Sequence, residues 1–174
     1  MVQIRERDLS ARDLFFLSQT LTKHAVDGRA KILVNDRVDI AGSTGAGVHL
    51  TTRSLSVDVV RKIIGPRMLV GASTHSLEEV ETAEKGGADF VVFGPIFETS
   101  SKAEYGPPVG IDELHKVTSS VTIPVLALGG IKPGNYAEVL SAGAAGIAGI
   151  SMFTETSDLS GLIGDIKLRR TTAA

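Results

Sequence analysis

The sequence contains no cysteine. Disulfide bridges, thiolate nucleophiles and thiolate-held metal ions are therefore excluded. A chain without cysteine is compatible with a reducing compartment, and we expect a cytoplasmic protein.

The chain also lacks a strong charge of either sign and a long apolar run. Its 18 basic and 20 acidic residues give a formal net charge of −2, which predicts neither a nucleic-acid partner nor a membrane partner. No apolar stretch approaches the ~20 residues needed to cross a bilayer, and the first residues lack the apolar core of a signal peptide. Its 174 residues, 43% of them hydrophobic, predict a single globular domain spanning residues 1–174.

Short apolar runs alternate with segments of helical periodicity along the whole chain. We expect strands near Val2–Arg5, Lys31–Asn35, Gly47–Leu50, Met68–Ala72, Phe90–Gly94, Val125–Leu128 and Gly146–Ile150. We expect helices near Ala11–His24, Val38–Thr44, Val57–Ile64, Leu77–Lys85, Ile111–Thr118, Asn135–Ala142 and Leu159–Arg169. This alternation predicts an α/β protein whose parallel sheet is covered by helices.

Three glycines precede predicted strands in the same context, at Gly45, Gly87 and Gly143. A glycine at this position ends a helix in the left-handed conformation. The first strand is not followed by the Gly-x-Gly-x-x-Gly of a dinucleotide-binding open sheet. We therefore favour a (β/α) barrel of the TIM type, whose sites gather where strands end.

Polar residues follow the first two predicted strands. Gln3, Arg5 and Arg7 would lie on one side of an alternating strand, with Ile4 and Glu6 opposite. Such an amide and two guanidiniums suit a diphosphate, although solvated charges on an edge strand are the alternative. Asn35-Asp36 offers ligands of the kind that Mg²⁺ prefers, although the same pair would also cap the next helix.

Two later segments suggest phosphate binding. The loop Gly94–Lys102 contains three small hydroxyl residues and a lysine, which can donate to phosphate oxygens, although such loops are also common solvated turns. Gly129-Gly130 and Gly149-Ile150-Ser151 follow the last two strands, where barrels often bind phosphate through backbone N–H groups. Tight packing is the alternative for these glycines, and it explains Gly146 better than Gly130. We expect His49 and His75 to be structural.

Several motifs occur together in a fixed order: Gln3-Ile-Arg-Glu-Arg7, Val34-Asn-Asp36, Gly47-Val-His-Leu50, Gly71–Glu79, Gly94-Pro-Ile-Phe97, Thr99–Lys102, Leu128-Gly-Gly-Ile131 and Gly149-Ile-Ser151. On these residues the chain resembles the thiamine phosphate synthase / thiazole tautomerase family from its first residue to about Phe153. The resemblance implies a synthase that joins 4-amino-5-hydroxymethyl-2-methylpyrimidine diphosphate to a thiazole phosphate. The products are thiamine monophosphate and pyrophosphate, Mg²⁺ is the cofactor, and the reaction passes through a pyrimidine methyl cation.

The resemblance also implies residue roles. Lys102 and Arg7 would be catalytic, and Asp36 would ligate Mg²⁺. The substrate-binding residues would be Gln3, Ile4, Arg5, Glu6, Arg7, Asn35, Ser73, Thr99, Ser100, Ser101, Lys102, Gly130, Ile150 and Ser151. A homodimer is a further expectation.

The chain departs from the family pattern at three points. It reads Thr51-Thr-Arg-Ser54 where synthases read Gly-Gln-Glu-Asp, so a hydroxyl replaces the second metal-binding carboxylate. It has Pro95 where tautomerases have their catalytic histidine, although Glu6 and Phe97-Glu-Thr99 are tautomerase-like. The family has one more strand and helix before Val2, so we expect seven of eight strands, that is, an N-terminally truncated barrel with unpaired edges. A tautomerase and a non-catalytic phosphate-binding relative remain the alternatives.

Overall fold

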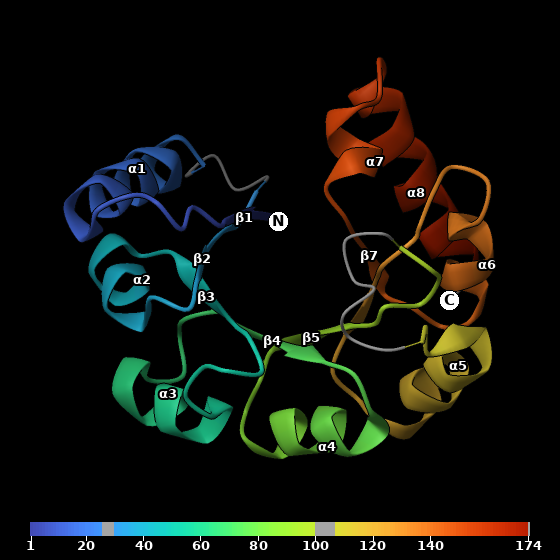
Figure 1. Ribbon diagram of the computed structural model, residues 1–174, viewed down its shortest axis with the longest axis horizontal. Helices are drawn as coiled ribbons and strands as arrows, with labels where there is room; N and C mark the ends of the chain where they lie inside the picture. The colour runs from blue at the N-terminus through green and yellow to red at the C-terminus, as the bar shows by residue number, and fades with distance from the viewer. Residues whose placement is uncertain (26–29, 100–106, 174) are drawn as a thin grey trace. The chain divides into compact units, whose positions relative to one another are not determined.

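The computed structural model describes residues 1–25, 30–99 and 107–173, with side chains as far as Arg169 in the last helix. Strands and helices alternate along the chain (Figure 1). The strands are β1 (Val2–Ile4), β2 (Ile32–Asn35), β3 (Gly47–Leu50), β4 (Val70–Thr74), β5 (Phe90–Phe93), β6 (Val125–Leu128) and β7 (Gly146–Ala148). The helices are α1 (Ala11–His24), α2 (Val38–Thr44), α3 (Val57–Ile64), α4 (Leu77–Lys85), α5 (Gly110–Ser120), α6 (Tyr136–Ser141), α7 (Ser151–Thr154) and α8 (Leu159–Ala173). The predicted seven parallel strands are confirmed.

The chain forms two compact units. One comprises Met1–Ser73 with Thr82–Asp89, and the other comprises Thr74–Glu81 with Phe90–Ala174. Each unit has its own buried apolar residues, so each is a packed body in its own right. The single domain expected from the chain length stays a prediction.

The first unit contains a parallel sheet in the order β1-β2-β3-β4. Asn35 lies opposite His49, and Leu50 lies opposite Ala72. The central strands are buried along their whole apolar length, with Val34 and Val48 fully inaccessible. Strands of a parallel sheet that is buried on both faces are expected to be this uniformly apolar.

The second unit contains a parallel sheet in the order β5-β6-β7. Leu128 at the end of β6 lies opposite Ala148 at the end of β7. The loops that follow these two strands therefore begin side by side. At the other side of the unit, Asp165 of α8 accepts hydrogen bonds from the Tyr136 hydroxyl and from Arg169 Nε, the latter at 3.1 Å, which attaches α8 to α6.

The predicted helix boundaries are largely confirmed because local signals determine them. Gly45, Gly87 and Gly143 have φ values of 71°, 91° and 91°, as a left-handed helix end requires. Ser10 caps α1 by accepting from the Asp13 N–H at 3.2 Å. Ser76 accepts from the Glu79 N–H at 3.2 Å, which is half of the capping box expected from the sequence.

Several boundaries differ from the prediction, among them those of β1, β4 and β7. Strand β1 ends at Ile4, so the alternation expected through Arg7 does not continue beyond it. Strand β4 begins at Val70 rather than Met68, because a turn follows Pro66 and the Met68 carbonyl accepts from the Arg61 side chain. Strand β7 ends at Ala148 rather than Ile150, and Ile150 is instead the N-cap residue of the short helix α7.

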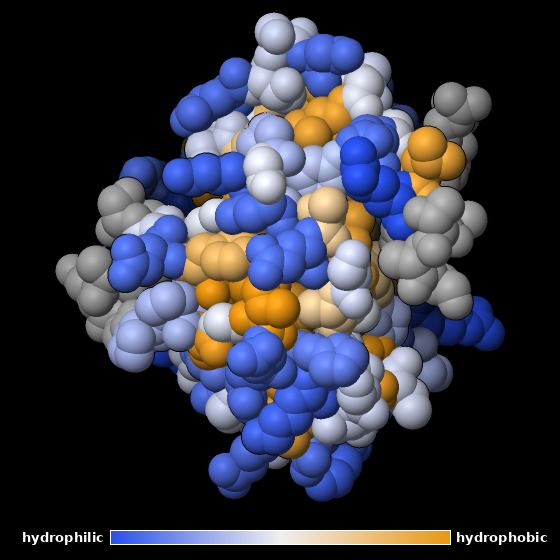
Figure 2. All heavy atoms as spheres, turned by 90° about the vertical axis from the view of Figure 1, so that its right-hand side faces the viewer, coloured by the Kyte–Doolittle hydropathy of each residue, from blue (hydrophilic) through white to orange (hydrophobic). Residues whose placement is uncertain are grey.

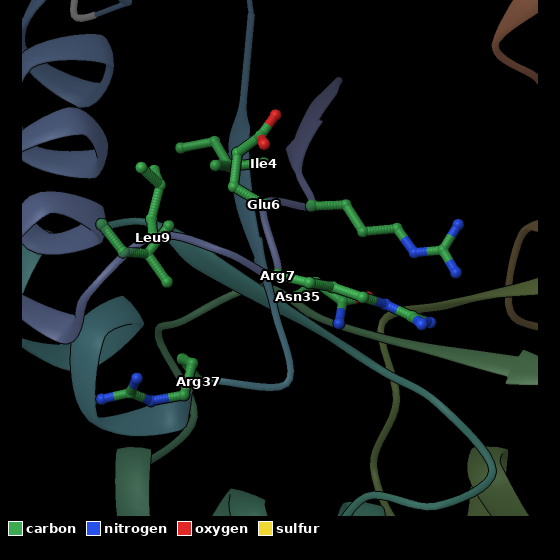
Figure 3. A pocket seen from close by; sticks show the side chains of 8 residues that line it. Ile4, Glu6, Arg7, Leu9, Asn35 and Arg37 are labelled. Carbon is green, nitrogen blue, oxygen red and sulfur yellow. The ribbon is translucent and has the colours of Figure 1, made fainter.

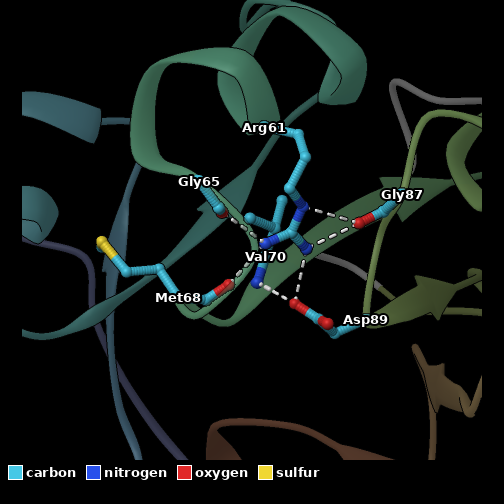
Figure 4. Close-up of polar contacts among 6 residues, drawn as sticks. All are labelled: Arg61, Gly65, Met68, Val70, Gly87 and Asp89. Carbon is cyan, nitrogen blue, oxygen red and sulfur yellow. Dashed lines mark hydrogen bonds and ion pairs between the residues drawn. The ribbon is translucent and has the colours of Figure 1, made fainter.

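Arg61 of α3 organises the segment that leads into β4 (Figure 4). Its guanidinium donates to the carbonyls of Gly65, Met68 and Gly87, at 2.6 to 3.2 Å, and pairs with Asp89 at 2.7 Å. The same Asp89 oxygen accepts from the Val70 N–H at 2.6 Å. One side chain thus satisfies the backbone of two turns and fixes the start of a buried strand.

Figure 2 views the side on which the C-terminal helices lie, where apolar side chains reach the surface among charged ones. In the second unit, the apolar side chains of Ile150, Leu159 and Ile163 are exposed. None of the helices in the described ranges has the length and apolar character needed to cross a membrane.

Candidate active site

The carboxyl ends of β1, β2 and β3 bring polar side chains together. We call this group the Asp36 cluster, and it consists of Gln3, Asn35, Asp36, His49, Thr51 and Ser54. Parallel pairing explains the group, because Asn35 and His49 are register partners at the ends of neighbouring strands. Residues far apart in sequence are thus collected at one edge of the sheet.

Gln3 and Asn35 form the amide half of the Asp36 cluster. Gln3 Nε2 donates to Asn35 Oδ1 at 2.8 Å and lies 3.1 Å from His49 Nδ1. Asn35 Nδ2 donates in turn to Asp36 Oδ2 at 3.2 Å. A chain of hydrogen bonds therefore runs from β1 to the carboxylate, and it fixes the orientation of both amides.

Asp36 forms the acidic half of the Asp36 cluster. Its backbone has the left-handed φ of 61°, which Asp adopts more readily than most residues. Its Oδ1 accepts from the hydroxyl of Ser54 and, at 3.4 Å, from that of Thr51. The N-cap residue of α2 is Arg37, without a side-chain capping bond, so the carboxylate belongs to the cluster and the helix-cap alternative is wrong.

His49 is the buried member of the Asp36 cluster, with 5% of its surface exposed. Burial lowers the pKa of His49 from 6.5 to about 4, while the charge of Asp36 opposes the shift and that of Arg5 adds to it. The ring is therefore neutral at pH 7, and its Nδ1 can accept the hydrogen bond from Gln3. The expectation of a packed histidine at this position is confirmed.

The His49 environment predicts how stability changes with pH. The pKa of His49 is about 4 in the folded protein, against the ordinary value of 6.5 that it regains on unfolding, so unfolding takes up a proton between these values. Stability should be complete above pH 6.5 and should fall by about 3 kcal/mol as pH drops to 4. Denaturant unfolding of the protein and of His49→Gln at several pH values measures this. A slope between pH 6.5 and 4 that is equally steep in both proteins would contradict it.

A cavity of about 210 Å³ opens beside the Asp36 cluster (Figure 3). It is lined by Ile4, Arg5, Glu6, Arg7, Leu9, Leu14, Asn35 and Arg37. Arg5, Glu6 and Arg7 thus line one cavity although β1 ends at Ile4, and the placement of Ile4 and Glu6 opposite the arginines stays a prediction. Arg37 is paired with Asp39 at 2.5 Å, and Arg5 and Arg7 are the other cationic side chains of the lining.

The loops after β5 and β6 form the candidate phosphate site of the second unit. The Ile96 N–H donates to the Leu128 carbonyl at 2.9 Å, and the Phe97 N–H donates to the Gly129 carbonyl at 3.1 Å. The pairing of the two strands thus continues into their loops. These two hydrogen bonds hold the segment 94–97 against Gly129 and Gly130.

Gly130 is required by this packing. A Cβ atom there would lie 2.6 Å from the Glu98 carbonyl oxygen and 2.7 Å from Phe97 Cβ, and its φ is 62°. A Cβ at Gly146 would lie 3.2 Å from the flexible end of Leu126. Packing therefore explains Gly130 better than Gly146, contrary to the expectation from the sequence.

The other predicted site residues are spread over the two units. Ser73 is half-buried in β4, and Thr99 is half-buried after β5. Ile150 and Ser151 are exposed at the start of α7. Ser100, Ser101 and Lys102 lie outside the described residues, so their roles stay predictions.

His75 behaves as a loop histidine beside a helix start. Its backbone N–H donates to Glu79 Oε2 at 2.6 Å, and its ring Nδ1 hydrogen-bonds the Gly94 carbonyl. The ring thereby links the loop before α4 to the end of β5. The structural role expected for His75 agrees with these contacts.

Thr51 and Asn135 were missed by the sequence reasoning. Thr51 contacts Asp36 across 15 positions, and only the register of β2 and β3 reveals that proximity. Asn135 is the N-cap residue of α6, yet its side chain bonds the diglycine loop. The sequence did contain a signal for Asn135, because asparagine at a predicted helix start usually uses its side chain to bind nearby backbone groups.

The Asp36 cluster has a composition suited to a hard cation. Besides the Asn35 amide nitrogen, the groups at Asp36 are its own carboxylate and the Ser54 and Thr51 hydroxyls, and such oxygens are ligand types of Mg²⁺. However, within residues 1–25, 30–99 and 107–173, no three or more His, Cys, Asp or Glu side chains are grouped to hold a metal. The residues therefore fit a Mg²⁺ that a substrate phosphate would help to bind, with Asp36 as the acidic ligand.

These features define a class of protein. Parallel strands carry polar and glycine-rich segments at their carboxyl ends, which is how α/β barrel proteins build sites for phosphorylated ligands. A solved structure, thiamine phosphate pyrophosphorylase from Pyrococcus furiosus, superposes with a TM-score of 0.85 and 34% identity, covering 98% of this chain and 82% of that one. The expected TIM-barrel-type α/β fold is confirmed.

Sequence comparison identifies the family. The thiamine monophosphate synthase family matches residues 1–153. A putative thiamine-phosphate synthase of Geobacter sulfurreducens is 47% identical over 158 residues, which are 90% of this chain and 74% of that protein. A thiamine-phosphate synthase of Roseiflexus sp. is 40% identical over 152 residues, 87% and 64% of the two chains. The chain belongs to the thiamine monophosphate synthase family, and the expected thiamine-phosphate synthase type of enzyme is confirmed at this level.

Proposed function

We propose that this protein joins 4-amino-5-hydroxymethyl-2-methylpyrimidine diphosphate to 4-methyl-5-(2-phosphoethyl)thiazole, forming thiamine monophosphate and pyrophosphate. The observation that carries the proposal is the Asp36 cluster beside a cavity lined by Arg5 and Arg7. A carboxylate next to two guanidiniums suits a diphosphate that is held jointly by cations and a metal ion. Family membership supports the same reaction.

The proposed roles divide between the two units. In the first unit, Gln3, Arg5, Arg7 and Asn35 bind the pyrimidine diphosphate, with Ile4 and Glu6 in the wall of the cavity and Ser73 on the pyrimidine. In the second unit, the thiazole phosphate binds to backbone and hydroxyl groups of the following residues: Thr99, Ser100, Ser101, Gly130, Ile150 and Ser151. Lys102 and Arg7 act as catalytic cations on the departing pyrophosphate.

Asp36 holds Mg²⁺ in this proposal. Bound Mg²⁺ would neutralise charge on the diphosphate as the carbon–oxygen bond breaks. Arg5 and Arg7 add fixed positive charge in the cavity, and such preorganised charge favours the departing anion without a protein nucleophile. The amides of Gln3 and Asn35 keep the carboxylate oriented, as supporting residues do around metal ligands.

The test is direct product formation. We expect the protein with both substrates and millimolar Mg²⁺ to release thiamine monophosphate and pyrophosphate in equal amounts, and we expect EDTA to stop the reaction. Chromatography of thiamine monophosphate together with a pyrophosphate assay measures this. Absence of product at every Mg²⁺ concentration would overturn the proposal. Metal-independent isomerisation of a carboxythiazole phosphate would then favour the tautomerase alternative, and thiazole phosphate binding without turnover would favour the binding-protein alternative.

A homodimer in the cytoplasm completes the proposal. Val59 and Ile63 are exposed one turn apart on α3, and Leu55 is exposed just before the helix begins. Sedimentation equilibrium of the protein would report the association.

A further inference from the structure

The side chain of Asn135 makes two hydrogen bonds to the loop between β6 and α6. Asn135 Oδ1 accepts from the Lys132 N–H at 2.7 Å, and its Nδ2 donates to the Gly130 carbonyl at 3.1 Å. Asparagine at an N-cap normally accepts from the second or third N–H of its helix, but Asn135 makes no such bond. Its side chain serves the loop instead of the helix.

The Gly130 carbonyl determines where the next N–H points. A trans peptide is planar, so its C=O and N–H point in opposite directions. Because Asn135 binds the Gly130 carbonyl, the N–H of Ile131 is directed away from Asn135. The orientation of this donor therefore depends on one side-chain amide.

The preceding peptide is fixed in the same manner. The Gly129 carbonyl accepts from the Phe97 N–H at 3.1 Å, so the N–H of Gly130 points away from Phe97. Among the residues that the structure describes, neither this N–H nor that of Ile131 has an acceptor. Two successive N–H groups held by anchored carbonyls can bind an anion.

We propose that Asn135 is a positioning residue for the thiazole phosphate, acting through the Gly130–Ile131 peptide. The inference rests on the proposed function, because that function supplies the phosphate. It adds a residue outside the loops that touch the ligand, and it explains why the amide is turned away from α6. Without Asn135 the peptide can rotate, and the second N–H is no longer directed to the anion.

The test uses Asn135→Ser, because serine is a good N-cap for α6 but cannot reach both loop partners. We expect the KM for the thiazole phosphate to rise about tenfold, as loss of one well-aligned hydrogen bond to a charged group implies. The KM for the pyrimidine diphosphate and the midpoint of thermal unfolding should hardly change. Asp158→Ala is the matched control, since Asp158 Oδ1 accepts from the Gly161 N–H at 2.8 Å at the start of α8; it should lower the unfolding midpoint and leave both KM values unchanged.

Calorimetry with the thiazole phosphate separates this inference from the proposed function. Weaker binding to Asn135→Ser than to the unaltered protein supports the positioning role. Equal affinities overturn that role and leave the synthase proposal in place. Failure of the unaltered protein to bind the thiazole phosphate overturns both. The positioning role would also be overturned if the KM values for both substrates rose, and rose equally in Asn135→Ser and in Asp158→Ala. General destabilisation would then explain the effect.

Discussion

Arg61→Ala should lower the free energy of unfolding by about 3 kcal/mol. The guanidinium donates to three backbone carbonyls and to Asp89, and its side chain is only 18% exposed. Removing it leaves those acceptors without their donor, and it leaves the Asp89 carboxylate beside the start of β4 without its cation. Such losses are large because the remaining partners stay partly buried. Urea unfolding followed by circular dichroism measures the change.

Lys62→Ala is the matched control for this prediction. Lys62 is the next residue of the same helix, is 77% exposed and pairs with Asp58 at 3.2 Å. A surface pair of this kind contributes little to stability, so the variant should unfold almost like the unaltered protein. Arg61→Lys should recover little, because a single ammonium cannot reach the same fork of acceptors. Equal stability losses for Arg61→Ala and Lys62→Ala would contradict the assigned role.

Asp36→Asn should reduce kcat/KM for thiamine monophosphate formation by at least about a hundredfold. Asparagine preserves the size of the side chain and tolerates the left-handed backbone at this position, so the fold should persist. What disappears is the negative charge that would hold Mg²⁺ against the diphosphate. Steady-state assays at saturating Mg²⁺ measure the loss. Asp39→Asn is the control, since that carboxylate is exposed and bound to Arg37.

Ser54→Asp tests the same assignment from the opposite direction. Ser54 now donates its hydroxyl to Asp36, and an aspartate there would offer a second carboxylate to the metal. The Mg²⁺ concentration for half-maximal activity should fall about tenfold, in line with the added charge interaction. Full activity of Asp36→Asn, or an unchanged Mg²⁺ requirement in Ser54→Asp, would rule out Asp36 as the metal ligand.

Local patterns predicted much of the secondary structure. The bounds of α1 to α4 agree with the sequence analysis, because serine caps and left-handed glycines are signals that act within a few residues. The start of β4 could not be predicted, since it depends on a side chain of α3 that binds the Met68 carbonyl. Helix α7 was missed because four residues are too few for a periodic pattern.

In the candidate site too, local sequence patterns identified some residues, while others could be found only from the pairing of distant strands. Asn35 and Asp36 could be predicted as site residues because side chains with oxygen ligands come at the end of an apolar strand. Their partners Thr51 and Ser54 lie 15 and 18 residues away from Asp36, and only the parallel register brings them to it. Strand alternation supports a prediction only as far as Ile4, where β1 ends, so the side to which Glu6 turns stays a prediction.

The close fit of Gly130 to Phe97 and Glu98 restricts how this protein can diverge. Any side chain at Gly130 would collide with the neighbouring loop. Substitution of Gly130 alone is therefore not tolerated, whatever ligand the loop binds. A tolerated substitution at Gly130 requires a simultaneous change in the 94–98 segment. A single substitution at Gly130 therefore cannot adapt the loop to another anion. We therefore expect the two loops to be inherited as a pair, and grafting them into another barrel to succeed only when both are transferred together.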